Sequence, residues 1–195
     1  LRPLFEAMGA DPTPTRILDL KVCDPAMGSG AFLVAACRAL GDKLVAAWQK
    51  HGMPAIPPDE DPGLHARRIV VQRWLYGVDK NPFAVDLAKL SLWRGTLAKD
   101  HPFTFLDHAL RHGDSLVGLS REQIASFHWI AGQTPIPLVR GELEAAVKKA
   151  EPLRAQIHAL AESDDVRDTR HLLDDAGDAL AYVRYAGDQI LEAFF

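Results

Sequence analysis

Apolar residues recur along the chain in two patterns, one typical of helices and one of short buried strands. Apolar side chains spaced three or four positions apart predict helices over residues 1–8, 31–48, 65–74, from 81 onward, and from 141 onward. Short apolar runs between turn-forming residues predict strands at 21–23, 75–79 and 103–112. Helices that alternate with strands favour an α/β fold with a parallel sheet.

The segment between the first strand and the next helix carries the most informative local pattern. Residues 24–30 read Asp-Pro-Ala-Met-Gly-Ser-Gly. An acid at a strand end, followed by a turn with two glycines, is typical of the loop where α/β folds receive a nucleotide-like ligand. Gly28 and Gly30 can take positive φ and let a ligand approach the main chain. We therefore expect a binding site here, with an ordinary strand-to-helix turn as the alternative.

The same loop discriminates between ligands. A dinucleotide-binding fingerprint would place a small residue at position 33, where this chain has Leu33. Asp24 would repel a phosphate and attract a cation, such as the α-ammonium of a methionine moiety. These features favour S-adenosylmethionine over NAD, and a nicotinamide-binding fold is the more distant alternative.

The second and third predicted strands also lead into an acid. Asp79, at the end of the second strand, is placed to accept hydrogen bonds from ribose hydroxyls. Asp114 could accept one from an adenine amine, with Ser115 or Leu116 offering a main-chain N–H to the ring. Because parallel strands end at one edge of a sheet, these acids and Asp24 together predict an adenosine site. Taken alone, Asp79 could equally be an exposed strand-end carboxylate.

Composition limits the classes of partner. The chain has 195 residues, 48% hydrophobic and 25% charged, which is typical of a globular protein. Its net charge of −4 argues against nucleic-acid binding over the whole surface. Residues 141–195 hold twelve acidic and six basic side chains, a net charge of −6, whereas residues 1–140 hold fourteen and sixteen, a net charge of +2. DNA contact by the C-terminal segment is therefore not expected.

Cysteine placement and hydropathy predict a reduced cytoplasmic protein. Cys23 and Cys37 fall on a predicted buried strand and helix, without further ligands at metal-binding spacing. We expect reduced core thiols and no metal site. No apolar run reaches the roughly 20 residues that a membrane span requires, and no leader pattern opens the chain. No membrane partner is expected.

Three segments, 24–33, 75–85 and 113–116, resemble the cofactor-loop, ribose-binding and adenine-binding motifs of adenine-N6 DNA methyltransferases. Their order and spacing resemble those of the large type II (IIG-like) restriction-modification enzymes, over roughly residues 1–120. The resemblance implies a Rossmann-like class I methyltransferase three-layer sandwich, here with a partial sheet, and S-adenosylmethionine as cofactor. Met27 stands where the family commonly has cysteine, a packing difference. The residues implied in cofactor binding are Asp24, Pro25, Ala26, Gly28, Ser29, Gly30, Asp79, Lys80, Asp114 and Ser115.

The family's catalytic motif, Asn/Asp-Pro-Pro-Tyr/Phe, does not occur in the sequence, so no catalytic residue is predicted. Asn81-Pro82-Phe83 lacks the second proline and reads more simply as a helix start. The family's N-terminal motif ending in Tyr-Thr-Pro is also absent. We therefore expect a fragment of a longer protein that binds cofactor weakly or not at all and does not methylate.

The expected organisation is a partial S-adenosylmethionine-binding core over residues 1–138 and an α-helical hairpin over 139–195, turning at the charged residues 162–168 and serving packing or spacing. The implied function is the cofactor-binding portion of a site-specific DNA adenine-N6 methyltransferase in restriction-modification, with double-stranded DNA bound by the full-length protein. A fused nuclease and a target-recognition domain are left open. The alternatives are a methyltransferase for RNA, protein or small molecules, and a non-catalytic scaffold module of the same fold.

Overall fold

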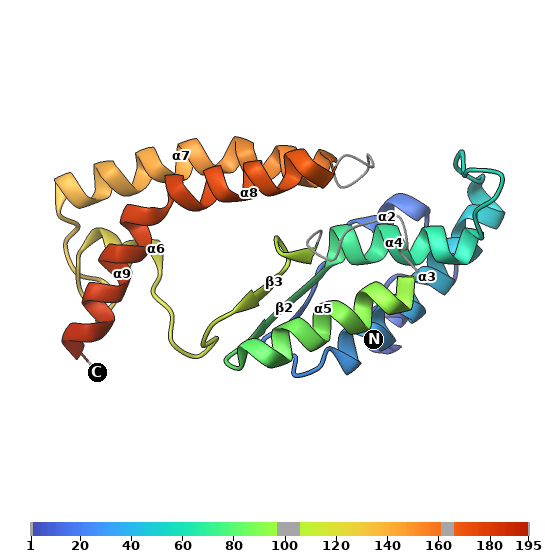
Figure 1. The fold of residues 1–195 in the computed structure, drawn as a ribbon, viewed down its shortest axis with the longest axis horizontal. Helices are drawn as coiled ribbons and strands as arrows, with labels where there is room; N and C mark the ends of the chain where they lie inside the picture. Colours follow the sequence, from blue (N-terminus) through green and yellow to red (C-terminus); the bar gives the residue numbers. More distant parts are fainter. Residues whose placement is uncertain (1, 97–105, 161–165, 195) are drawn as a thin grey trace. The chain divides into compact units, whose positions relative to one another are not determined.

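The computed structural model describes residues 2–96, 106–160 and 166–194 (Figure 1). The chain forms two compact units, Leu1–Ser115 and Leu116–Phe195. The expected boundary lies at residue 138, whereas the two compact units meet after residue 115, because helix α6, Arg121–Ala125, packs on the helices that follow it. The assignment of the two units as domains stays a prediction.

The first unit alternates helices with short parallel strands. β1, β2 and β3 pair in that order, with Val22 beside Leu75 and Gly77 beside Leu110. The predicted α/β class with a parallel sheet is confirmed. The elements are α1 Arg2–Ala7, α2 Pro14–Leu18, β1 Val22–Asp24, α3 Ala31–His51, α4 Pro62–Trp74, β2 Leu75–Asp79, α5 Pro82–Thr96 and β3 Leu110–His112.

Helix starts in this unit follow local sequence chemistry. Asn81 starts α5 as predicted, because its side chain accepts a hydrogen bond from the Phe83 N–H at 3.0 Å, with proline at the first helical position. Residues 14–18 lie outside the helices that the sequence pattern predicts. They form α2, because the Thr13 hydroxyl accepts from the Arg16 N–H and Pro14 presets the helical φ.

One face of the sheet is buried and the other is more open. Because β1, β2 and β3 follow one another across the sheet, right-handed connections would place α3 and α5 on one face, and these two helices contact each other. Val22, Leu75 and Leu110 are buried there, whereas Cys23 points to the opposite face and is exposed. The prediction that Cys23 is a core thiol is wrong. Cys37 on α3 is buried, as predicted, and its burial raises the thiol pKa to about 12.

Helix α5 buries a narrower stripe than its sequence suggests. Val85, Ala88 and Leu92 are buried, whereas Leu87 and Leu90 are about half exposed, at 53% and 48%. The apolar residues of α5 therefore do not all pack on the sheet. The buried positions, three and four residues apart, define one side of the helix, and the two leucines lie outside that side.

The third strand is shorter than predicted. Residues 110–112 form β3, whereas residues 106–109 form a turn in which the Ala109 N–H donates to the Leu106 carbonyl at 3.0 Å. Lys89 of α5 holds this turn through an ion pair with Asp107 at 2.6 Å. Residues 103–105 of the predicted strand lie outside the described residues.

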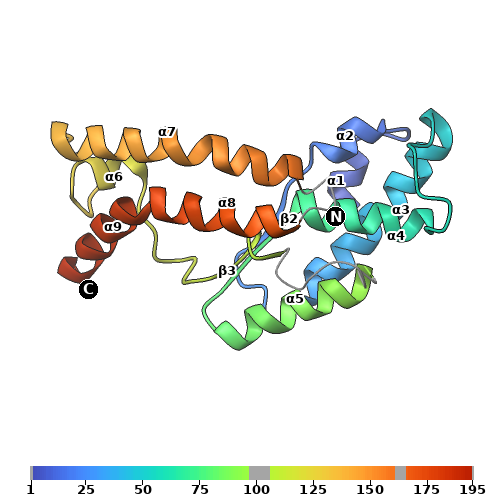
Figure 2. The ribbon, with the colours of Figure 1, turned by 45° about the horizontal axis from the view of Figure 1, so that its top comes forward.

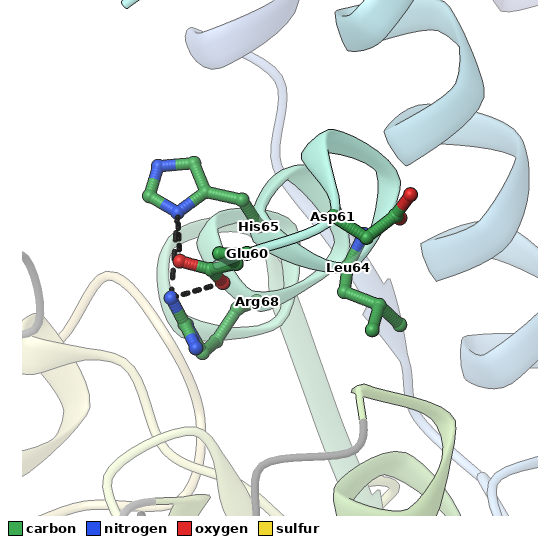
Figure 3. Close-up of polar contacts among 5 residues, drawn as sticks. All are labelled: Glu60, Asp61, Leu64, His65 and Arg68. Carbon is green, nitrogen blue, oxygen red and sulfur yellow. Dashed lines mark hydrogen bonds and ion pairs between the residues drawn. The ribbon is translucent and has the colours of Figure 1, made fainter. Parts of the chain in front are cut away.

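The loop before α4 is anchored by a partly buried carboxylate (Figure 3). Glu60 has a side chain only 14% exposed and pairs with both His65, at 3.0 Å, and Arg68. Asp61 next to it caps the helix by accepting from the Leu64 N–H at 2.9 Å. The proline-rich loop before α4 is thus anchored at its C-terminal end.

Replacing Glu60 with alanine should lower the free energy of unfolding by about 1–3 kcal/mol, because His65 and Arg68 lose a charged hydrogen-bond partner. Urea denaturation would measure the loss. Asp59→Ala is the matched control. Because the Asp59 side chain is exposed, this substitution should lower the free energy of unfolding by less than about 0.5 kcal/mol. Equal losses for the two variants would contradict the anchoring role of Glu60.

The second unit is helical throughout its described elements. Its longest helices, α7 Pro137–Leu160 and α8 Val166–Ala179, lie side by side and run antiparallel (Figure 2). A short α6 precedes them, and a capping box between Ser120 and Gln123 starts it. The second predicted helix is divided after α8, and α9 spans Ala181–Phe194. The predicted turn at 162–168 lies partly outside the described residues.

Within the described ranges, none of the helices combines the length and apolar character that crossing a membrane would require.

Candidate cofactor-binding site

Three acids predicted from the sequence lie at one edge of the sheet. Asp24 ends β1 and Asp79 ends β2, while Asp114 follows β3 by two residues. Because all three strands are parallel, their carboxyl ends share an edge, where open α/β folds bind ligands. None of the three carboxylates lies in the buried core, since each side chain is partly exposed.

The glycine turn between β1 and α3 adopts the backbone that its sequence predicts. Gly28 and Gly30 have φ values of +53° and +79°. A Cβ added at Gly28 would meet no atom within 4 Å, whereas one at Gly30 would lie 3.0 Å from the Ala88 Cβ. Gly28 therefore borders open space, and Gly30 lets α3 begin close against α5.

Strand β2 shapes this turn through Gly77, which the sequence pattern did not single out. Met27 is 4% exposed, and a Cβ on Gly77 would lie 2.3 Å from its Sδ atom. The Met27 N–H also donates to the Val78 carbonyl at 3.0 Å. A glycine inside a buried strand marks a close approach, and that signal could have identified Gly77.

The Asp79 carboxylate accepts two main-chain hydrogen bonds. The Asn81 N–H donates to Oδ1 and the Gly28 N–H donates to Oδ2, both at 2.8 Å. These two bonds, and to a smaller extent nearby His112, hold the Asp79 pKa below its usual 3.8. Asp24 makes a local contact, accepting from the Ala26 N–H at 3.1 Å. Asp79 thus joins the end of β2 to the turn that follows β1.

A family model described as MmeI, DNA-methyltransferase domain, matches residues 12–112. The match spans just over half of the chain and includes Asp24, the glycine turn and Asp79. The chain belongs to the MmeI DNA-methyltransferase domain family. The predicted resemblance to methyltransferases of type IIG restriction-modification enzymes is thereby confirmed. No curated protein and no solved structure matches the chain.

In this MmeI-family chain, an ion pair connects the ends of β2 and β3. The Lys80 Nζ lies 3.2 Å from the Asp114 Oδ2, and the Lys80 side chain is 83% exposed. Asp114 and Ser115 lie beyond the matched segment, so their predicted role at an adenine ring stays a prediction. The other predicted contact residues have exposed side chains beside the glycine turn or after Asp114, namely Pro25, Ala26, Ser29 and Ser115.

The depressed pKa of Asp79 predicts an acid-sensitive contribution to stability in the MmeI-family fold. This contribution is present above the unfolded-state pKa of about 4 and is lost as pH falls through the lower folded-state value. Urea unfolding at a series of pH values should therefore show a shallower acid loss for Asp79→Asn than for the wild-type protein. The pKa of Asp11 is also lowered, by its contact with Lys50. Both proteins should therefore carry Asp11→Asn, which removes the acid sensitivity that Asp11 contributes. Identical acid slopes with and without Asp79 would rule out this contribution.

Proposed function

We propose that this edge of the sheet binds S-adenosylmethionine and that the chain supplies the cofactor-binding portion of a site-specific DNA adenine-N6 methyltransferase in restriction-modification. The observation that carries the proposal is the direct bond between Asp79 and the glycine turn, beside the ends of β1 and β3. The family match supports DNA as the substrate over RNA, protein or a small molecule. Methylation of cellular DNA would place the protein in the cytoplasm.

The residues at the edge fit the chemical groups of this cofactor. Asp24 would attract the α-ammonium of the methionine end, and Asp79 would accept the ribose hydroxyls. Asp114 would accept from the adenine amine, with the Ser115 N–H directed to the ring. The open space beside Gly28 leaves room for a ligand against the main chain. The cofactor would supply an electrophilic methyl group, and the protein would contribute position and electrostatic setting.

Residues 1–195 contain the proposed cofactor-binding residues but lack the motif that binds the target adenine in this class of enzyme. The tetrapeptide Asn/Asp-Pro-Pro-Tyr/Phe is absent from the sequence, and Asn81 serves as the cap of α5. Because the turn and the three acids are already in place, we propose that these residues bind the cofactor weakly. Methyl transfer by this segment alone is not expected.

Equilibrium dialysis with labelled S-adenosylmethionine tests the choice of cofactor. Unlabelled S-adenosylhomocysteine should displace the label, and NAD should not. Displacement by NAD at lower concentration than S-adenosylhomocysteine would instead support a nicotinamide site. A second assay mixes the chain with duplex DNA and labelled cofactor, and turnover by residues 1–195 would overturn the expectation that they do not methylate DNA without the tetrapeptide.

A further inference from the structure

Three consecutive residues of β2 contact the turn that follows β1. A Cβ on Gly77 would collide with Met27, so the absence of a side chain makes room for that methionine. Val78 accepts from the Met27 N–H, and Asp79 accepts from the Gly28 N–H. The first two contacts hold Met27, and the third holds Gly28, the residue that borders open space. The Asp79 carboxylate is therefore the β2 group that fixes the ligand-facing part of the turn.

The same carboxylate retains capacity for a ligand. An ionised carboxylate has about four acceptor positions on its two oxygens. The described contacts use one position on each oxygen, for the Asn81 and Gly28 N–H groups. One further position on each oxygen can accept a ribose hydroxyl while both main-chain bonds remain.

We infer that Asp79 is a positioning residue for the methionine end of the cofactor as well as the acceptor for its ribose. The inference rests on the proposed function and extends it. Gly28 adopts φ of +53° beside the site, and its N–H is held at 2.8 Å by Asp79. Loss of the carboxylate releases the turn and alters the surface on which the methionine moiety lies. Asp79 thus couples the two ends of the site.

Asp114 provides the matched comparison. It is a partly exposed acid at the same edge, and it forms an ion pair with Lys80, the residue that follows β2. Substitution of Asp114 should weaken binding of the adenosine moiety without releasing the Gly28 N–H.

The first measurement needs no cofactor. Amide hydrogen exchange of Gly28, followed by NMR in the full chain, should be about tenfold faster in Asp79→Asn than in the wild-type protein, since a charge-assisted bond is weakened. Asp79→Ala should give at least as large an effect, and Asp114→Asn should give none. The asparagine variant keeps the side-chain size, so it tests the inference if the alanine variant does not fold. Unchanged Gly28 exchange in folded Asp79→Asn would overturn the inference.

The second measurement separates the two ends of the ligand. S-adenosylhomocysteine and 5′-methylthioadenosine share the adenosine moiety, and only the first carries the amino-acid end. The ratio of their affinities should fall about tenfold in Asp79→Asn and stay constant in Asp114→Asn. A constant ratio in Asp79→Asn with weaker binding of both ligands would overturn the inference and leave the proposed function standing. Absence of binding by the wild-type protein would overturn the proposed function itself.

Discussion

Replacing Gly30 with alanine should lower the free energy of unfolding by about 2–5 kcal/mol, combining left-handed backbone strain with overpacking. Gly30 has φ of +79°, and an added Cβ would lie 3.0 Å from the Ala88 Cβ and 3.1 Å from the Ala88 Cα. Because the second atom belongs to the backbone of α5, a side-chain rotation cannot relieve the contact. The two helices would have to separate, and urea denaturation would measure the cost.

Gly28→Ala is the matched control for this substitution. Its φ of +53° imposes similar backbone strain, but the added Cβ would meet nothing within 4 Å. The expected loss is about 1–2 kcal/mol, from strain alone. Equal losses at the two glycines would show that close packing between α3 and α5 contributes nothing, contrary to the structure. Gly28→Ala should still weaken cofactor binding, because the methyl group would project into the space assigned to the ligand.

Gly77→Ala should destabilise the protein by about 1–3 kcal/mol and displace the glycine turn. The added Cβ would lie 2.3 Å from the Met27 Sδ and 3.0 Å from the Leu33 Cδ1. Met27 is the more movable neighbour, so it should shift and carry the adjacent turn with it. Binding of S-adenosylhomocysteine should weaken in parallel, which isothermal titration calorimetry would measure.

A double-mutant cycle with Met27→Ala tests the cause. Met27→Ala alone should cost about 2–5 kcal/mol through the cavity that it leaves. Combined with Gly77→Ala, the loss should be smaller than the sum of the single losses by more than about 0.5 kcal/mol, because the added methyl enters that cavity. Additive losses would show that Gly77 and Met27 do not share this space.

The sequence predicted the elements whose signals are local. β2 has its predicted bounds, Leu75–Asp79, because an apolar run there ends at a capped helix start. The positive φ values of Gly28 and Gly30 were likewise predicted, since two closely spaced glycines after a strand are typical of a turn that needs left-handed backbone. Asp24, Asp79 and Asp114 were placed at one sheet edge because parallel topology requires it.

The errors arose where tertiary packing decides the outcome. Cys23 and Leu87 are apolar enough to be buried, but strand alternation and the narrow contact of α5 expose them. The role of Gly77 depends on the Met27 side chain, which lies fifty residues earlier in the sequence. The hydrogen bond from the Gly28 N–H to Asp79 also joins residues far apart in the sequence. The spacing of motifs along the sequence could therefore not show that Asp79 holds the glycine turn.

The most direct test of the central claim is an NMR titration of the chain with S-adenosylmethionine, following the amide signals of Gly28, Asp79 and Asp114. If the residues at the three strand ends bind one ligand, these signals should all shift and reach saturation along one common binding curve. Signals that shift along separate curves, or shifts confined to other parts of the chain, would contradict a shared site at this edge of the sheet.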